Sequence, residues 1–194
     1  MPFKVRQKFI PFYFYAAVTL GMLAAAIASG GPSKTGILKL LVLGFLSWGL
    51  IEYGLHRFIF HYDAKSEVGR KFIYAAHLSH HDNPKSKDNL FASLRFSVPI
   101  AAAYWLLAWG TLGTWQAAAY LFIGLVAGYF SYEWLHLQAH HGKSGLPVLR
   151  YLKKYHLLHH YRTPELRFGV TSPVFDLIFG TFRSAADTRS VFKH

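Results

Sequence analysis

The chain has 194 residues, of which 53% are hydrophobic and only 15% are charged, and its formal net charge is +12. Soluble domains average about 25% charged residues, so this composition favours a membrane protein, and the basic residues are too dispersed around long apolar blocks to indicate nucleic-acid binding. Because the chain has no cysteine, disulfides, cysteine-ligated zinc and iron–sulfur clusters are excluded, and any metal must have nitrogen or oxygen ligands.

Two apolar segments near the N-terminus predict a first transmembrane hairpin. No charged residue occurs between Phe9 and Ser33, and roughly 20 apolar residues cross a hydrocarbon core. We therefore expect a first span at about 10–29 and a second at about 37–56, separated by a Gly-Gly-Pro turn at 30–32.

A longer uncharged segment predicts a second hairpin. Residues 96–132 contain no charged residue, and as one helix they would extend about 55 Å, far beyond the roughly 30 Å hydrocarbon core. The segment must fold back, and GTLGT at 110–114 is the natural turn. This gives two further spans, at about 96–111 and 115–134.

Lysine and arginine are distributed unequally around these hairpins. Only Lys34 and Lys39 lie beside the first turn and none lies in the second, whereas all the others lie in the N-terminus, in 57–95 or after residue 136. The positive-inside rule then places both termini and 57–95 in the cytoplasm. We predict a single domain, residues 1–194, that is an all-α integral membrane protein with four transmembrane helices in two hairpins and a cytoplasmic helical cap.

Eleven of the twelve histidines fall into four groups with the spacing of metal ligands. The groups form a repeat, because each hairpin delivers histidines at its cytoplasmic exit and an HxxHH motif follows further along the chain. In chain order, the members are His56 and His61; His77, His80 and His81; His136, His140 and His141; and His156, His159 and His160.

Helical geometry explains the spacing. Residues at i, i+3 and i+4 share one helix face, so each HxxHH is expected to aim two or three imidazoles at one point. His56 and His61 converge only if the helix ends or bulges between them, and we expect it to end there. Four ligands saturate zinc and six fill an octahedron, so eleven imidazoles predict two metal ions that share them, with zinc, iron, copper and nickel all open.

Two carboxylates and one tyrosine precede these histidines. Glu52 and Glu133 lie at apolar helix ends, where an unpaired carboxylate is costly. We expect each to accept the free ring N–H of a ligand histidine, which fixes the tautomer and raises ligand basicity. Tyr132, one turn before His136, is placed to donate to a bound oxygen species, although it is also an ordinary interfacial tyrosine.

At these residues the sequence resembles the fatty acid hydroxylase/sterol desaturase superfamily of membrane di-iron enzymes. The fatty acid 2-hydroxylases are the most similar subfamily, above all in the third and last motifs. The matching motifs are EYGLHRFIFH (52–61), HLSHHDNP (77–84), YEWLHLQAHH (132–141), LKKYHLLHHY (152–161) and FGVTSPVFDLIFGTF (168–182).

The resemblance implies a di-iron centre that uses O2, although purified relatives can carry zinc. It implies ten metal ligands and leaves open whether His141 joins them. These ligands are His56, His61, His77, His80, His81, His136, His140, His156, His159 and His160.

We therefore expect an O2-dependent hydroxylase of a lipid acyl chain that enters from the bilayer. No haem-binding module fits in the first 50 residues, so a separate acidic donor, a ferredoxin or cytochrome b5, is expected to dock on the basic cytoplasmic face. The short chain favours a bacterial inner membrane over the endoplasmic reticulum. The alternatives are a sterol or carotenoid hydroxylase or desaturase, a zinc hydrolase and a metal transporter.

Overall fold

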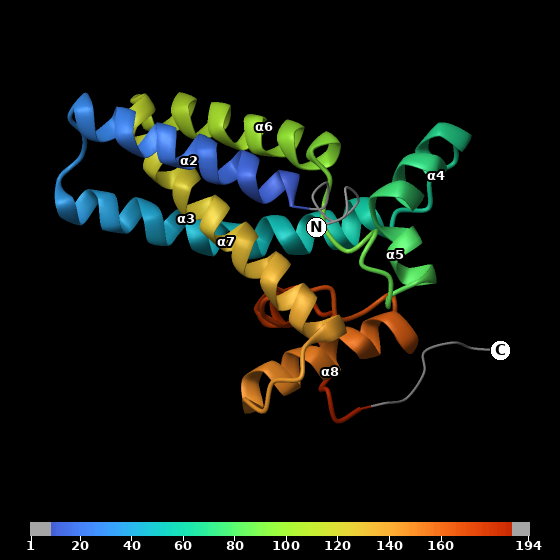
Figure 1. Ribbon diagram of the computed structural model, residues 1–194. Coiled ribbons are helices and arrows are strands. Elements are labelled where there is room, and N and C mark those ends of the chain that lie inside the picture. The colour runs from blue at the N-terminus through green and yellow to red at the C-terminus, as the bar shows by residue number, and fades with distance from the viewer. Residues whose placement is uncertain (1–8, 188–194) are drawn as a thin grey trace. The chain divides into compact units, whose positions relative to one another are not determined.

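The structure is a computed structural model that describes residues 9–187, and within these residues it is helical and contains no strand (Figure 1). The chain divides into two compact units, one formed by Met1–Trp48 and Phe91–Phe130 and the other by Gly49–Leu90 and Ser131–His194. The basic residues at positions 4, 6 and 8, which contributed to the predicted orientation, lie outside the described residues.

The first unit contains four long helices whose positions match the predicted hairpins. α2 (Ile10–Ala28) lies wholly in this unit, as does α6 (Leu94–Leu112), whereas α3 (Lys34–Gly54) and α7 (Trp115–His141) continue into the second unit. The turn predicted at 110–114 is confirmed, because Gly113 ends α6 in the left-handed conformation with φ of 72°.

Close backbone contact holds α3 against α7 within the first unit. A Cβ atom at Gly124 would overlap the carbonyl oxygen of Leu41, and one at Gly44 would overlap that of Leu121. Small residues allow helix backbones to approach in this way. A core of Ala26, Ala119 and Tyr120 joins α2 to α7 in the same unit.

Two of the helices among the described residues are long and apolar enough to cross a membrane, Ile10–Ala28 and Lys34–Phe60. Both belong to the first predicted hairpin. Helices α6 and α7 have the predicted positions, but their role as the third and fourth spans stays a prediction.

Short helices make up most of the second unit. A π-helix, η1, directly follows α3, and a second one, η2, lies between two short α-helices. In chain order, the elements are η1 (Leu55–Phe60), α4 (Glu67–Ile73), η2 (Tyr74–Leu78), α5 (Ser79–Asp82), α8 (Pro147–Tyr161) and α9 (Val174–Ile178).

Local sequence explains how two of these helices begin. Ser66 caps α4 by accepting a hydrogen bond from the backbone N–H of Gly69 at 3.1 Å, which satisfies an otherwise unpaired helix donor. α8 begins with Pro147, whose fixed φ suits the first helical turn. α8 then packs Tyr155 and Leu158 against Ala185, so the C-terminal part of the unit covers this helix.

Candidate metal centre

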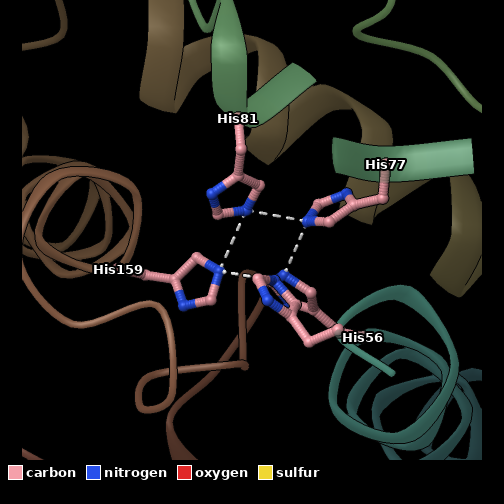
Figure 2. A group of neighbouring side chains, drawn as sticks. His56, His77, His81 and His159 are labelled. Atoms are coloured by element: carbon pink, nitrogen blue, oxygen red, sulfur yellow. Dashed lines mark hydrogen bonds between the residues drawn. The ribbon is translucent and has the colours of Figure 1, made fainter. Parts of the chain in front are cut away.

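The ten histidines implied as ligands come together in the second unit as two groups of five. Within each group the five ligand nitrogens all lie within 4.8 Å of one another. The first histidine group consists of His56, His61, His77, His81 and His159, and the second of His80, His136, His140, His156 and His160. Figure 2 shows four members of the first group, whose rings converge from η1, η2, α5 and α8.

Each HxxHH motif is divided between the two groups, so two of its three rings aim at one point, which is the smaller of the two expected numbers, and the third ring joins the other group. The residues at i and i+4 share a group, as His77 and His81 do in the first. The residue at i+3 joins the other group, as His80 does. The i and i+3 directions differ by about 60° around a helix, whereas i and i+4 differ by about 40°. One motif therefore contributes rings to both groups.

A π-helix brings His56 and His61 into the same group. Their five-residue separation would place them far apart around an α-helix, but η1 covers Leu55–Phe60 and has the wider i→i+5 turn. The two ring centroids are 5.1 Å apart. The sequence required either an end or a bulge here, and the structure has a π-helix that ends at Phe60.

The spacing of the ring nitrogens fits a bound metal ion. In both groups, neighbouring Nε2 atoms lie 2.9 to 3.2 Å apart. An ion about 2.1 Å from two nitrogens at a right angle separates them by about 3.0 Å, whereas a tetrahedral angle separates them by about 3.4 Å. The spacing therefore matches adjacent ligands at right angles.

Hydrogen bonds between the rings do not explain this packing. An imidazole nitrogen carries either one N–H or one lone pair. His77 Nε2 lies 3.0 Å from Nε2 of His56 and 2.9 Å from that of His81, and a single proton or lone pair cannot serve both neighbours well. A cation that accepts all five lone pairs satisfies the whole group.

Two backbone carbonyls orient rings of the first group. His56 Nδ1 lies 2.5 Å from the carbonyl oxygen of Phe168, and His159 Nδ1 lies 2.7 Å from that of Leu166. A carbonyl only accepts, so each Nδ1 carries the proton and each Nε2 presents its lone pair to the group. This arrangement orients metal-ligating histidines and raises their basicity.

These carbonyls belong to residues 166–171, which we call the anchoring loop. Two buried carboxylates hold its four consecutive amides. Asp176 accepts from the N–H groups of Phe168 and Gly169, both at 2.8 Å. Glu52 accepts from those of Val170 and Thr171, at 2.5 and 2.9 Å. Charge-assisted hydrogen bonds therefore fix four of the six residues of the loop.

Glu52 was expected to accept the ring N–H of a ligand histidine, and the structure gives it other partners. Its carboxylate binds the anchoring loop, including the Thr171 hydroxyl at 2.5 Å, and the Nδ1 of His56 is taken by the Phe168 carbonyl instead. Glu52 therefore acts on the first group through the loop. At Gly169 a Cβ would overlap the carbonyl oxygen of Ser172, so only glycine fits this path.

Burial keeps the imidazoles neutral. It lowers the pKa of His61 and of His80 to about 4. It also lowers the pKa of His77 and of His159 well below the ordinary 6.5, and repulsion from neighbouring rings adds to the effect. Neutral imidazole is the metal-binding form. Near pH 7 both groups therefore present lone pairs.

Regular helices carry most of the second group. His136 and His140 are an i, i+4 pair on α7, and His156 and His160 are one on α8. Within residues 9–187, the Nδ1 atoms of four members are buried without a hydrogen-bond partner, which contrasts with the carbonyl-bound rings of the first group. These four are His80, His136, His156 and His160.

The remaining predicted residues lie beside the second group or outside both groups. Tyr132 stacks on the ring of His136 with centroids 5.6 Å apart, and Glu133 is fully buried on the same helix. Their roles in the chemistry stay predictions. His141 belongs to neither group, and its ring centroid is 6.4 Å from that of His140.

Sequence reasoning missed the residues that build the anchoring loop, chiefly Arg167 and Asp176, both fully buried. Asp176 had a usable signal, because a lone carboxylate within the apolar stretch VFDLIF needs buried partners. Arg167 had none, because an arginine in a polar tail is ordinarily exposed.

The chain is similar to known fatty acid hydroxylases. The chain matches the model of the fatty acid hydroxylase family over residues 41–181. It is 37% identical over 153 residues to a dihydroceramide fatty acyl 2-hydroxylase of Arabidopsis thaliana, covering 79% of this chain and 64% of the plant protein. It is 40% identical over 146 residues to the ceramide very long chain fatty acid hydroxylase of Saccharomyces cerevisiae, covering 74% and 38% of the two chains.

A solved structure agrees with these matches. It is described as full-length Scs7p with only the hydroxylase domain visible, and it superposes with a TM-score of 0.84 at 32% identity, covering 95% of this chain and 69% of that one. The chain thus spans less than two thirds of the plant and yeast relatives. The match over residues 41–181 includes all ten clustered histidines, and the chain belongs to the fatty acid hydroxylase family.

Proposed function

We propose that this chain is an O2-dependent hydroxylase of a lipid acyl chain and that its two histidine groups hold two iron ions. The observation that carries the proposal is the convergence of five ring nitrogens in each group, within 4.8 Å of one another. The relatives are named as 2-hydroxylases of fatty acids or of the acyl groups of ceramides. We therefore assign the new hydroxyl to carbon 2 of a fatty acid or sphingolipid acyl chain.

The chain's own residues prepare the site. Iron, when bound, supplies the reduction of O2 that oxidation of an unactivated C–H bond requires. The protein keeps the imidazoles neutral, orients two of them through the Leu166 and Phe168 carbonyls, and shields the ring nitrogens from bulk water. Tyr132 and Glu133, beside the second group, are placed to hold or move protons during the reaction.

An apolar cavity in the first unit suits a lipid chain. It has a volume of about 340 Å³ and is lined by side chains of α2, α6 and α7, among them Val18, Ala102 and Trp105. We propose that acyl chains bind among the membrane helices. The four-span topology, with both termini and the histidine groups in the cytoplasm, follows from the positive-inside rule.

Hydroxylation with O2 also needs two electrons and two protons, because the second oxygen atom leaves as water. We propose an acidic electron-transfer protein, a ferredoxin or cytochrome b5, as the donor. α8 offers it a basic face with Arg150, Lys153 and Lys154, which together with Arg162 directly after the helix line a shallow cavity of about 390 Å³. The same helix carries His156, His159 and His160 on other faces, so a donor there lies one helix away from the ligands.

Charge reversal tests the docking face. Arg150→Glu with Lys154→Glu should raise the KM for a reduced acidic ferredoxin about 10-fold or more and weaken the salt dependence, because electrostatic steering is lost. Lys71→Glu is the control, since Lys71 is an exposed residue of α4. Equal effects of the two changes would remove α8 as the docking face.

Labelled oxygen tests the reaction. The iron-loaded protein, supplied with a reducing partner, long-chain fatty acid or ceramide and ¹⁸O2, should give a 2-hydroxy product that carries one labelled atom. Product oxygen taken from water would overturn the proposal. Turnover without iron would instead support zinc hydrolysis, although five ring nitrogens exceed the three protein ligands typical of hydrolytic zinc sites. Lipid profiles of a host with and without the chain would reveal a sterol or carotenoid substrate.

A further inference from the structure

Arg167 has two unfavourable features at one position. Its backbone is left-handed, with φ of 62°, and it is the only non-glycine residue with positive φ among residues 9–187. Its side chain is also fully buried. A charged group is costly to bury, and strained backbone persists only where the surroundings over-determine it, often at functional sites.

The position of Arg167 in the anchoring loop gives these features a meaning. It lies between Leu166 and Phe168, whose carbonyls accept from His159 and His56. Its φ and ψ set the direction of one peptide group relative to the next. A change to an ordinary right-handed or extended conformation would therefore turn at least one carbonyl away from its imidazole.

The guanidinium holds this conformation in place. It donates to the Thr163 hydroxyl and to the carbonyl oxygens of Arg183 at 3.2 Å, Ser184 at 3.1 Å and Asp187 at 2.6 Å. The backbone N–H of Arg167 donates to the Thr181 carbonyl at 3.1 Å. The residue is thus fixed through both its side chain and its backbone.

We propose that Arg167 is the positioning residue of the first histidine group. Its guanidinium holds the left-handed backbone that aims two carbonyls at His159 and His56, and the carbonyls fix both rings with Nε2 towards the metal. This proposal rests on the proposed function in one respect, namely that the first group binds a metal ion. It also predicts that changes at Arg167 weaken only the ion of the first group, because the hydrogen bonds of Arg167 reach no residue of the second group.

A matched pair of variants separates backbone from side chain. Arg167→Ala and Arg167→Gly both remove the guanidinium, but only glycine adopts positive φ without steric cost. Arg167→Ala should weaken binding of one ion per chain about 10- to 100-fold, the range typical for loss of an orienting partner. Arg167→Gly should weaken the same ion less. The second ion should be unchanged in both variants.

Metal analysis of the purified protein against chelators of graded strength gives the affinity of each ion. Arg183→Ala is the control, because it removes a partly exposed guanidinium from the same segment and leaves the Arg183 carbonyl in place. It should retain both ions. The retained second ion in the Arg167 variants reports that the protein is folded.

The outcomes discriminate clearly. Wild-type affinity for both ions in Arg167→Ala would overturn this proposal alone, and so would equal weakening of both ions, which indicates a purely structural arginine. Tighter binding by Arg167→Ala than by Arg167→Gly would overturn the role of the left-handed backbone. A wild-type protein that binds no metal would overturn the proposed function, and this proposal with it.

Discussion

The two histidine groups each contain five imidazoles, but the chain orients them by different means. The second group takes two i, i+4 pairs from the regular helices α7 and α8, and only His80 comes from elsewhere. The first group has one i, i+4 pair, His77 in η2 and His81 in α5, and collects its other members from η1, from His61 directly after η1, and from α8. Carbonyls of the anchoring loop contact the first group.

This difference shows that histidine rings carried by irregular backbone need contacts from elsewhere in the chain to orient them. A regular helix fixes the relative directions of two side chains by its own hydrogen bonds, so an i, i+4 pair is oriented without further help. Rings that come from separate segments need an external reference. In this protein the loop 166–171 supplies it, and two buried carboxylates hold the loop. The first group should therefore depend on distant residues and the second on helix packing.

Removal of one ring from each group is the strongest test of the division. His159 and His156 are fully buried on the same helix, three residues apart, yet belong to different groups. His159→Ala and His156→Ala should each reduce hydroxylation more than about 100-fold, beyond the loss expected for an outer partner. Each should also lose one metal ion, which elemental analysis per chain measures.

The control for these variants is His141→Ala, because His141 lies next to the second group but outside it. It should keep both ions. Full metal content in both the His156 and the His159 variant would show that the groups are not metal sites.

Asp176→Asn tests the dependence of the first group on its loop. The amide cannot accept from both Phe168 and Gly169 as the carboxylate does, so the free energy of unfolding in micelles should fall by about 2–3 kcal/mol. The ion of the first group should weaken and that of the second should not. Asp63→Asn, at an exposed side chain, should change stability by less than about 0.5 kcal/mol. A loss confined to the second ion would reverse the comparison.

The sequence predicted the parts of this protein that depend on local periodicity. Apolar length and turn residues predicted the four long helices, and the HxxHH spacing predicted histidines gathered for two metal ions, which the two groups of five match. The same reasoning left open whether two or three rings of each motif meet at one point, because a 60° difference in direction becomes decisive only when two binding points lie a few ångströms apart. That separation is set by tertiary packing.

The anchoring loop could not be predicted for a related reason. Its function lies in the carbonyls of Leu166 and Phe168, and every residue has a carbonyl, so the sequence carries no mark of which ones are used. The left-handed conformation at Arg167 is equally hidden, because arginine gives no local signal for positive φ. Glu52 was recognised as significant, but its partners lie more than a hundred residues away.

Removal of metal by a chelator should show a smaller difference between the two groups than mutation does. Outer hydrogen-bond partners typically contribute 10- to 100-fold in metal affinity, and the structure gives such partners to His56 and His159 of the first group. A chelator titration of the intact protein should therefore release two ions in two steps, with the second-group ion first. His159→Ala protein identifies that step, because it keeps only the second-group ion. Release of both ions in one step would mean that the loop does not strengthen binding.

Both groups should contribute equally to the loss of stability in acid, whereas a chelator should distinguish them. Burial lowers the pKa of His61 in the first group and of His80 in the second to about 4, against 6.5 in an unfolded chain. Between these values the unfolded chain binds more protons, so the free energy of unfolding of the metal-free protein should fall as the pH drops from about 6.5 towards 4. His61→Gln and His80→Gln should each flatten this slope to a similar degree in unfolding experiments. A free energy of unfolding that rises as the pH falls would contradict the burial of neutral rings in both groups. A slope that only His61→Gln changes would show that the groups differ in burial as well as in anchoring.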